Sequence, residues 1–208
     1  MSQSMQLFKG VLLIIIMMAC SNFEDKHVGI QPLGSVQEGL LDSVAKTIHK
    51  VYGFEVDILP SKEIPQSTFI NQKSPRYRAD KLIRWLKETK PDSLDFILGL
   101  LEKDISTTKR DKDGNVLKPI SRYEDWGVFG LGYRPGASSV VSTFRFKNRE
   151  KSKFTDRLKK ICTHELGHNL GLKHCPNKKC VMTDAAESIK TIDNVNLRLC
   201  ASCTRKVN

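Results

Sequence analysis

The chain has 208 residues, of which 34 are basic and 23 acidic, so that it carries a net charge of +11. This length suits one well-buried domain and is short for two. The charge is densest between Arg145 and Lys160, but aromatic residues that could stack on bases are not regularly interleaved there, which argues against nucleic acid as a partner. A solvated loop and helix face is the preferred interpretation, with attraction to an anionic lipid surface as the alternative.

The N-terminal segment has the pattern of an export signal. Lys9 is followed by an apolar run over residues 11–18, which is far shorter than the roughly 20 residues of a membrane-spanning helix. Ala19 directly precedes Cys20, as at a bacterial lipoprotein cleavage site, so residues 1–19 are predicted to be a signal peptide and Cys20 the lipidated N-terminus. An ordinary secretory signal or a short buried helix is the alternative.

The remaining chain divides into a short polar tether, residues 20–26, and a single domain, residues 27–208. Acyl chains on Cys20 would anchor the protein stably. We therefore expect it at the cell envelope, bound to a membrane and facing outside the cytoplasm, and we expect it to act as a monomer.

The first half of the domain alternates strands with helices. Residues 40–51 carry apolar side chains at helical spacing and are closed by Gly53, whereas residues 94–101 are almost wholly apolar, as in a strand that is buried on both faces. The elements predicted here are a strand over His27–Leu33, a helix over 40–51, a strand over 54–59, a helix over 78–90 and a strand over 94–101. Such alternation predicts an α/β fold with a mostly parallel sheet covered by helices.

A charged stretch, residues 106–126, separates these elements from two further strands. Its centre, residues 111–115, is a strong turn signal, so a surface hairpin is predicted. The two strands are predicted over residues 127–133 and 138–146. Glycines within the first of them indicate either a close approach of another backbone or a tight bend or bulge.

The motif HExxHxxGxxHC begins at His164. On a helix, His164 and His168 are one turn apart, so both imidazoles lie on one face and can bind one metal ion. The carboxylate of Glu165 stands next to a ligand, where it can contact a metal-bound water instead of the metal, as a general base does.

The second half of the motif supplies a third ligand. Gly171 can adopt the positive φ of a helix C-terminal turn, so the chain can reverse and bring His174 back to the metal. Three histidines leave one position of a tetrahedral zinc open, which is typical of a catalytic site. Cys162, two residues before the motif, is interpreted as a buried thiol.

Four cysteines follow, beginning with the last residue of the motif. Their spacing, one CxxxxC pair and one CxxC pair, matches a tetrahedral four-thiolate zinc site that stabilises the fold. Two disulfides are the alternative, since an exported chain meets oxidising conditions. The residues concerned are Cys175, Cys180, Cys200 and Cys203.

The full string HExxHxxGxxHC-x4-C-x-M-x17-C-x-x-C closely resembles the signature of the archaemetzincin family of metallopeptidases. The resemblance implies a metzincin-like fold: a twisted mixed sheet of about five mostly parallel strands, an active-site helix and a small C-terminal subdomain bound to zinc through four cysteines. It implies two zinc ions per chain. The residues that it assigns are a catalytic zinc on His164, His168 and His174, a general base at Glu165, a methionine turn at Met182, a structural zinc on Cys175, Cys180, Cys200 and Cys203, and an edge strand for an extended substrate at Gly130, Leu131 and Gly132.

These residues predict a zinc-dependent peptidase that hydrolyses peptide bonds in a peptide or protein with a zinc-activated water and a glutamate general base. The alternative is a catalytically weak, zinc-stabilised binding lipoprotein on the cell envelope. Glu165 argues against that alternative, because a binding protein has no need of a carboxylate that neither ligates zinc nor packs in the core.

Overall fold

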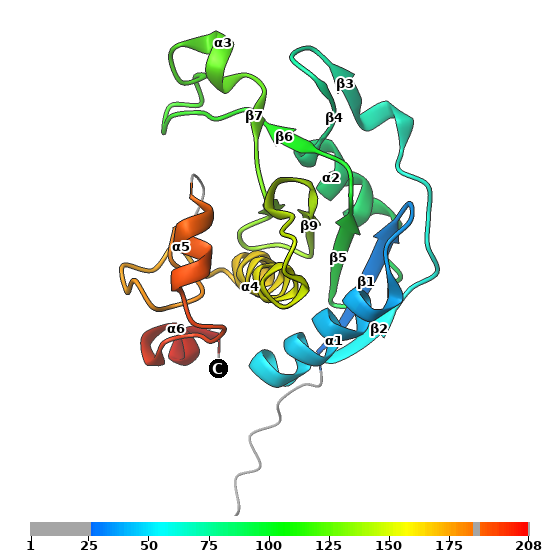
Figure 1. The fold of residues 1–208 in the computed structure, drawn as a ribbon, viewed down its shortest axis with the longest axis vertical. Helices are drawn as coiled ribbons and strands as arrows, with labels where there is room; N and C mark the ends of the chain where they lie inside the picture. Colours follow the sequence, from blue (N-terminus) through cyan, green and yellow to red (C-terminus); the bar gives the residue numbers. More distant parts are fainter. Residues whose placement is uncertain (1–25, 185–187, 208) are drawn as a thin grey trace, which may run out of the picture.

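The computed structural model describes residues 26–184 and 188–207 (Figure 1). The predicted signal peptide, Cys20 and all but the last residue of the tether lie outside these residues. Within them, no helix has the length and apolar character required to cross a membrane.

A five-stranded sheet forms the centre of the molecule. Its strand order is β2-β1-β5-β9-β8, and every neighbouring pair is parallel except β8 with β9. This arrangement confirms the predicted α/β fold. The strands are β1 (His27–Leu33), β2 (Glu55–Ile58), β5 (Phe96–Leu101), β8 (Gly130–Gly132) and β9 (Ser138–Ser142).

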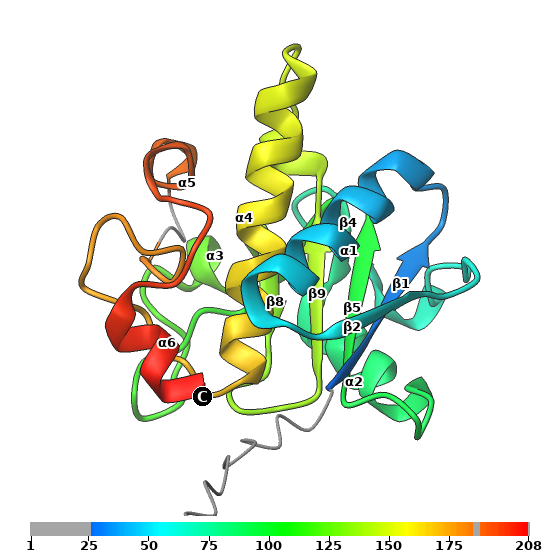
Figure 2. The same ribbon diagram turned by 90° about the horizontal axis from the view of Figure 1, so that it is seen from below.

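Helices cover both faces of this sheet (Figure 2). Helices α1 (Glu38–Tyr52) and α4 (Lys151–Asn169) pack on one face, and α2 (Ala79–Thr89) packs on the other. Strand β5 shows why its sequence is apolar throughout: Leu98 and Leu100 face α1 and α4, whereas Ile97 and Leu101 face α2. The connection from β1 through α1 to β2 and the connection from β2 through α2 to β5 run in opposite directions across the sheet. Since such crossovers are right-handed, their helices are expected on opposite faces, as observed for α1 and α2.

A second, four-stranded sheet stands beside the first and was not predicted. It has the order β3-β4-β6-β7. Three of its strands are only two or three residues long, too short to leave a pattern in the sequence. Its strands are β3 (Phe69–Asn71), β4 (Pro75–Arg78), β6 (Ile105–Thr107) and β7 (Trp126–Gly127). The short helices η1 (Gln66–Thr68) and α3 (Ile120–Tyr123) lie in the segments before β3 and before β7.

The hairpin predicted over residues 106–126 is present and forms part of the second sheet. The turn itself is present, since the Asp111 carboxylate accepts hydrogen bonds from the N–H groups of Asp113 and Asn115 at 2.9 Å. The two ends of the segment are the antiparallel strands β6 and β7, and Arg110 pairs with Val116 beside the turn. The segment therefore connects two strands of a sheet and carries α3 between them.

The two strands predicted after this segment are also shorter than expected. Trp126–Gly127 belongs to the second sheet and Gly130–Gly132 to the first, so the strand predicted over residues 127–133 is wrong as a single element. The strand predicted over residues 138–146 ends at Ser142, and Phe144–Phe146 forms a 3-10 turn, η2. Alternating apolar residues cannot reveal that a chain changes sheets.

The C-terminal residues pack beside α4, on the side away from β1 and β2 (Figure 1). They carry α5 (Ile189–Asn194) and α6 (Ala201–Val207). A small separate apolar core holds this subdomain together and consists of Leu172, Cys180, Val181, Met182 and Cys203. The predicted C-terminal subdomain built around four cysteines is thus observed.

Candidate metallopeptidase site

Three imidazoles converge at the C-terminal end of α4. His164 and His168 come from its last two turns, and His174 comes from the loop that follows. One ring nitrogen from each imidazole lies within 4.8 Å of the corresponding atoms of the other two. The ring centroids are 4.6 Å apart for His164 and His168, 5.3 Å for His164 and His174, and 5.0 Å for His168 and His174.

A glycine makes the third histidine possible. Helix α4 ends at Asn169, and Gly171 then adopts a φ of +87°, which side chains with a Cβ rarely tolerate. Its N–H group donates to the His168 carbonyl at 2.8 Å, while the Leu172 N–H group donates to the Gly167 carbonyl at 3.0 Å. The chain reverses here as expected and brings His174 back toward the helix.

Each imidazole is oriented by a partner on its Nδ1 atom. His164 Nδ1 donates to the Val181 carbonyl at 2.8 Å, and His168 Nδ1 donates to the Leu172 carbonyl at 2.7 Å. Because a carbonyl can only accept, these bonds place the proton on Nδ1 and leave the lone pair of Nε2 for a metal. His174 Nδ1 lies 3.4 Å from Asp184 Oδ2.

Burial keeps the first two histidines uncharged. Burial, followed by repulsion from His168, lowers the pKa of His164 to about 3. Burial is also the main cause of the lowered pKa of His168. At neutral pH both rings are therefore neutral, which is the form that ligates zinc.

Glu165 lies buried next to these ligands, under strand β8. Its side chain is 7% exposed, and burial raises its pKa to about 8. Strand β8 lies close against α4: a Cβ atom on Gly130 would lie 2.7 Å from Glu165 Oε1, and one on Gly132 would lie 2.8 Å from the Glu165 carbonyl oxygen. The neighbouring atom belongs to the backbone of α4 at Gly132, as the reading of a close backbone approach requires, and to a side chain at Gly130.

Met182 packs against α4 at Gly167, within the histidine motif. It is completely buried, and a Cβ atom on Gly167 would collide with its sulfur and lie 3.1 Å from the Tyr52 hydroxyl oxygen. The Tyr52 hydroxyl in turn donates to the carbonyl of Thr163, the residue before His164, at 2.6 Å. A methionine and a tyrosine thus support the turn of α4 that carries the motif.

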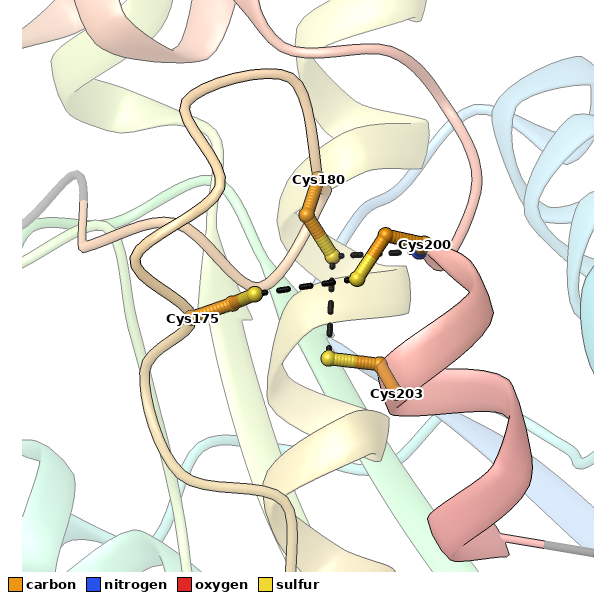
Figure 3. A group of neighbouring side chains, drawn as sticks. All are labelled: Cys175, Cys180, Cys200 and Cys203. Carbon is orange, nitrogen blue, oxygen red and sulfur yellow. Dashed lines mark hydrogen bonds between the residues drawn. The ribbon is translucent and has the colours of Figure 1, made fainter.

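The four cysteines form a second cluster, in the loop after His174 and at α6 (Figure 3). All four sulfurs lie within 4.8 Å of one another, with 3.7 Å between Cys175 and Cys200 and 3.8 Å between Cys180 and Cys203. A disulfide requires about 2.05 Å. Sulfurs that bind one zinc tetrahedrally at about 2.3 Å stand about 3.8 Å apart, so the observed spacing fits a four-thiolate zinc.

Hydrogen bonds also prepare this cluster for a metal. The backbone N–H group of Cys200 donates to the sulfur of Cys180 at 3.3 Å. The backbone N–H group of Cys203 is the main cause that lowers the pKa of the Cys200 thiol to about 7. Both bonds favour thiolates, which are the form that binds zinc, whereas burial raises the pKa of Cys180 and Cys203.

A cleft of about 380 Å³ opens above the three histidines and Glu165. Strand β8 forms one wall of this cleft and lies at the edge of the five-stranded sheet. Residues of β6, α4 and the C-terminal subdomain complete the lining, among them Thr107, Ile161, Val181, Ile192 and Val195.

A family model described as peptidase family M54 matches residues 23–208. The chain belongs to peptidase family M54. Archaemetzincin from Haloarcula marismortui is 32% identical over 190 residues, which cover 87% of this chain and 99% of that protein. The matched region excludes the predicted signal peptide and Cys20.

Solved structures agree with this M54 assignment. Archaemetzincin from Archaeoglobus fulgidus superposes with a TM-score of 0.67 at 28% identity, covering 86% of this chain and 99% of that one. Archaemetzincin from Methanopyrus kandleri has a TM-score of 0.70 at 24% identity, covers 90% of this chain and 96% of that one, and supports the fold alone. The family and the site geometry together make this chain a zinc metallopeptidase, as predicted.

Sequence reasoning missed several residues of this M54 site. Asp184 beside His174 and Tyr52 beneath α4 are separated from the motif in the chain, and neither has a sequence signal that could have revealed it. Arg134 and Lys109 line the cleft from loops of the two sheets. Only the folded chain brings these side chains to the motif.

Proposed function

We propose that this M54 peptidase hydrolyses peptide bonds with a catalytic zinc held by Nε2 of His164, His168 and His174. The observation that carries the proposal is the convergence of three imidazoles, two of them kept neutral by burial, at the floor of a cleft that also holds a buried carboxylate. Three imidazole donors with one position left open are the ligand set of a catalytic zinc.

Bound zinc would supply a Lewis acid that polarises the scissile carbonyl and acidifies the attacking water. Glu165 takes the proton from that water and later delivers it to the leaving amine. Its burial favours this double role, because the raised pKa makes the protonated form stable enough to act as an acid near neutral pH. A cation on the neighbouring histidines would draw this pKa down from about 8, toward the pH at which the enzyme works.

An extended peptide is the substrate that fits the cleft. In the part of the chain that the structure describes, β8 pairs on one side only, with β9. Its free edge can form backbone hydrogen bonds with a substrate strand, and this is the role that we propose for Gly130, Leu131 and Gly132. Because a Cβ atom on Gly130 would meet the Glu165 side chain, a peptide paired with this edge would pass close to the catalytic base.

We propose a second, structural zinc on Cys175, Cys180, Cys200 and Cys203. The sulfur spacing supports it, as does the position of Cys175, the residue that follows His174. The Cys175 N–H group donates to the Met182 carbonyl at 2.8 Å, so a zinc on the cysteines would stabilise the segment between the third histidine and the methionine turn.

The test of the catalytic proposal is Glu165→Gln in the zinc-loaded protein. We expect the zinc content to stay unchanged and the rate of peptide hydrolysis to fall by roughly two to four decades, the range for a general base. Glu88→Gln, an exposed glutamate on α2 across the sheet, is the matched control and should leave the rate unchanged. Full turnover in Glu165→Gln would refute the assignment of the base.

The rival function is a zinc-stabilised binding protein without meaningful turnover. Incubation of the protein with a mixed peptide library, with and without a metal chelator, separates the two functions. Reproducible cleavage that the chelator abolishes favours the peptidase. Intact peptides under both conditions favour the rival.

We further propose that the chain is exported and anchored to a membrane through a lipid on Cys20. The support is the leader itself, a basic residue and a short apolar run that end in Ala19 before Cys20. Labelling with palmitate should disappear in Cys20→Ala. Labelling that persists in this variant would contradict the proposal.

A further inference from the structure

The cleft above the histidines is unevenly charged. Three cationic side chains line it, those of Lys109, Arg134 and Lys160, whereas Glu165 is the single carboxylate among the lining residues that the structure describes. The whole chain adds to this bias with its net charge of +11. A cleft lined by one sign of charge attracts ligands of the opposite sign.

Two of these three cations already have partners within the protein. Lys160 Nζ lies 2.7 Å from the Asp156 carboxylate, and its side chain is only 8% exposed. Lys109 Nζ lies over the Trp126 ring, 4.4 Å from its centroid. In contrast, the exposed side chain of Arg134 makes no hydrogen bond or ion pair with any residue of 26–184 or 188–207.

Hydrogen bonds to the active-site helix hold the backbone on either side of Arg134 in place. The side-chain amide of Asn169, the residue after His168, donates to the carbonyls of Tyr133 at 3.0 Å and Ser138 at 2.9 Å. The Gly136 N–H group donates to the Asn169 carbonyl at 3.1 Å. The loop that carries Arg134 is therefore held against the last turn of α4, where β8 ends.

We propose that Arg134 binds a carboxylate group of the substrate, so that the peptidase prefers acidic peptides. This inference rests on the proposed function, since it assumes that a peptide lies along β8. A chain paired with that strand runs past the loop at its end, and a guanidinium group can donate two parallel hydrogen bonds to a carboxylate. The carboxylate belongs either to an Asp or Glu side chain or to the C-terminus of the peptide.

Four peptides of otherwise identical sequence test the inference and separate these two sources. They combine Glu or Gln at a position flanking the scissile bond with a free or an amidated C-terminus, and kcat/KM is measured for each. We expect the zinc-loaded enzyme to favour the peptide that carries the carboxylate over its neutral counterpart by roughly tenfold, as suits a charged contact in a partly exposed site. The preference should weaken as salt is added.

Arg134→Gln should abolish this preference, and Arg134→Lys should retain part of it. Arg84→Gln is the matched control: it removes the same charge from an exposed position of α2, across the sheet, and should leave all four values unchanged. A thermal unfolding curve for each variant confirms that the fold is intact.

The outcomes distinguish this inference from the function on which it rests. If the enzyme cleaves none of the four peptides, nor any peptide of a mixed library, the proposed function itself fails. If it cleaves acidic and neutral peptides equally, or if its preference survives in Arg134→Gln, the peptidase stands and the role of Arg134 is refuted.

Discussion

The close contact between β8 and α4 predicts that alanine substitutions at Gly130 and Gly132 have different effects. Gly130→Ala and Gly132→Ala each add one methyl group to the same face of β8, two residues apart. The methyl group on Gly132 would meet the backbone carbonyl of Glu165 at 2.8 Å, whereas the methyl group on Gly130 would meet the Glu165 side chain at 2.7 Å. The two variants should therefore fail in different ways.

Gly132→Ala should mainly lose stability. The contact is shorter than ordinary van der Waals distance by about 0.6 Å, and a backbone carbonyl inside helix α4 cannot rotate away. Overpacking of this kind costs roughly 1–3 kcal/mol, and each kcal/mol lowers the Tm of a domain of this size by about 2–4 °C. We expect the Tm to fall by roughly 2–12 °C.

Gly130→Ala should mainly lose activity. The Glu165 side chain can move aside, so the stability cost is smaller, but the movement takes the carboxylate away from its catalytic position. Since a displacement of about 1 Å costs roughly a hundredfold in rate, we expect kcat/KM to fall by about ten- to a hundredfold.

Thermal unfolding of the zinc-loaded variants and hydrolysis of a reference peptide measure both effects. Gly39→Ala in α1 is the matched control, because a Cβ atom there meets no atom within 4 Å. Its Tm should equal that of the parent or exceed it slightly. If Gly132→Ala matches this control in Tm, or Gly130→Ala matches it in kcat/KM, the strand does not lie against the helix as described and the reasoning fails.

Three further predictions concern the metal sites and acid stability. Asp184→Ala should weaken zinc binding at the three histidines about ten- to a hundredfold, measured by competition with a chromogenic chelator, and Asp184→Asn should lie closer to the parent. Equal zinc affinities of Asp184→Ala and the parent would contradict the contact between Asp184 and His174. Cys203→Ser should lower the zinc content from two ions per chain to one by elemental analysis, and two ions in the variant would refute the four-thiolate site. The hydrogen bonds from Arg157 lower the pKa of Asp193 in the folded protein. The Asp193 carboxylate therefore stabilises the fold at any pH above its unfolded-state pKa of about 4. This stabilisation is lost as the pH falls through the lower folded-state pKa. The Tm of Asp193→Asn should therefore lie below that of the parent near pH 7 and approach it in acid, whereas a constant difference would show that the ion pair is not responsible.

The sequence alone predicted most of the first sheet and its helices. Strand β1 has the predicted bounds, and α1 and α2 lie within two residues of theirs, because apolar periodicity and Gly or Pro at the ends report directly on local structure. The second sheet escaped prediction since its strands are short and pair with residues far along the chain. Local sequence patterns do not show which distant strands pair, because that pairing forms only when the chain folds.

The chemistry was predicted in the same way, because the motif is a local object. One helical turn joins His164 to His168, a glycine turn brings His174 back, and Glu165 is the next residue along the helix, so the spacing of a few residues determines the geometry. The four cysteines likewise come in two short pairs, which restricts how far apart their sulfurs can lie.

Only the tertiary structure showed which segments surround the histidines and Glu165. Strand β8 reaches the site across 33 residues of chain, from Gly132 to Glu165, and it explains both the glycines and the burial that raises the Glu165 pKa to about 8. The cleft is lined by segments of both sheets, α4 and the C-terminal subdomain, and Arg134 reaches it from the loop that follows β8. Residue spacing thus determined the metal ligands and the base, whereas burial, the shape of the cleft and its charge depend on distances between remote segments, which only the packing of the folded chain can set.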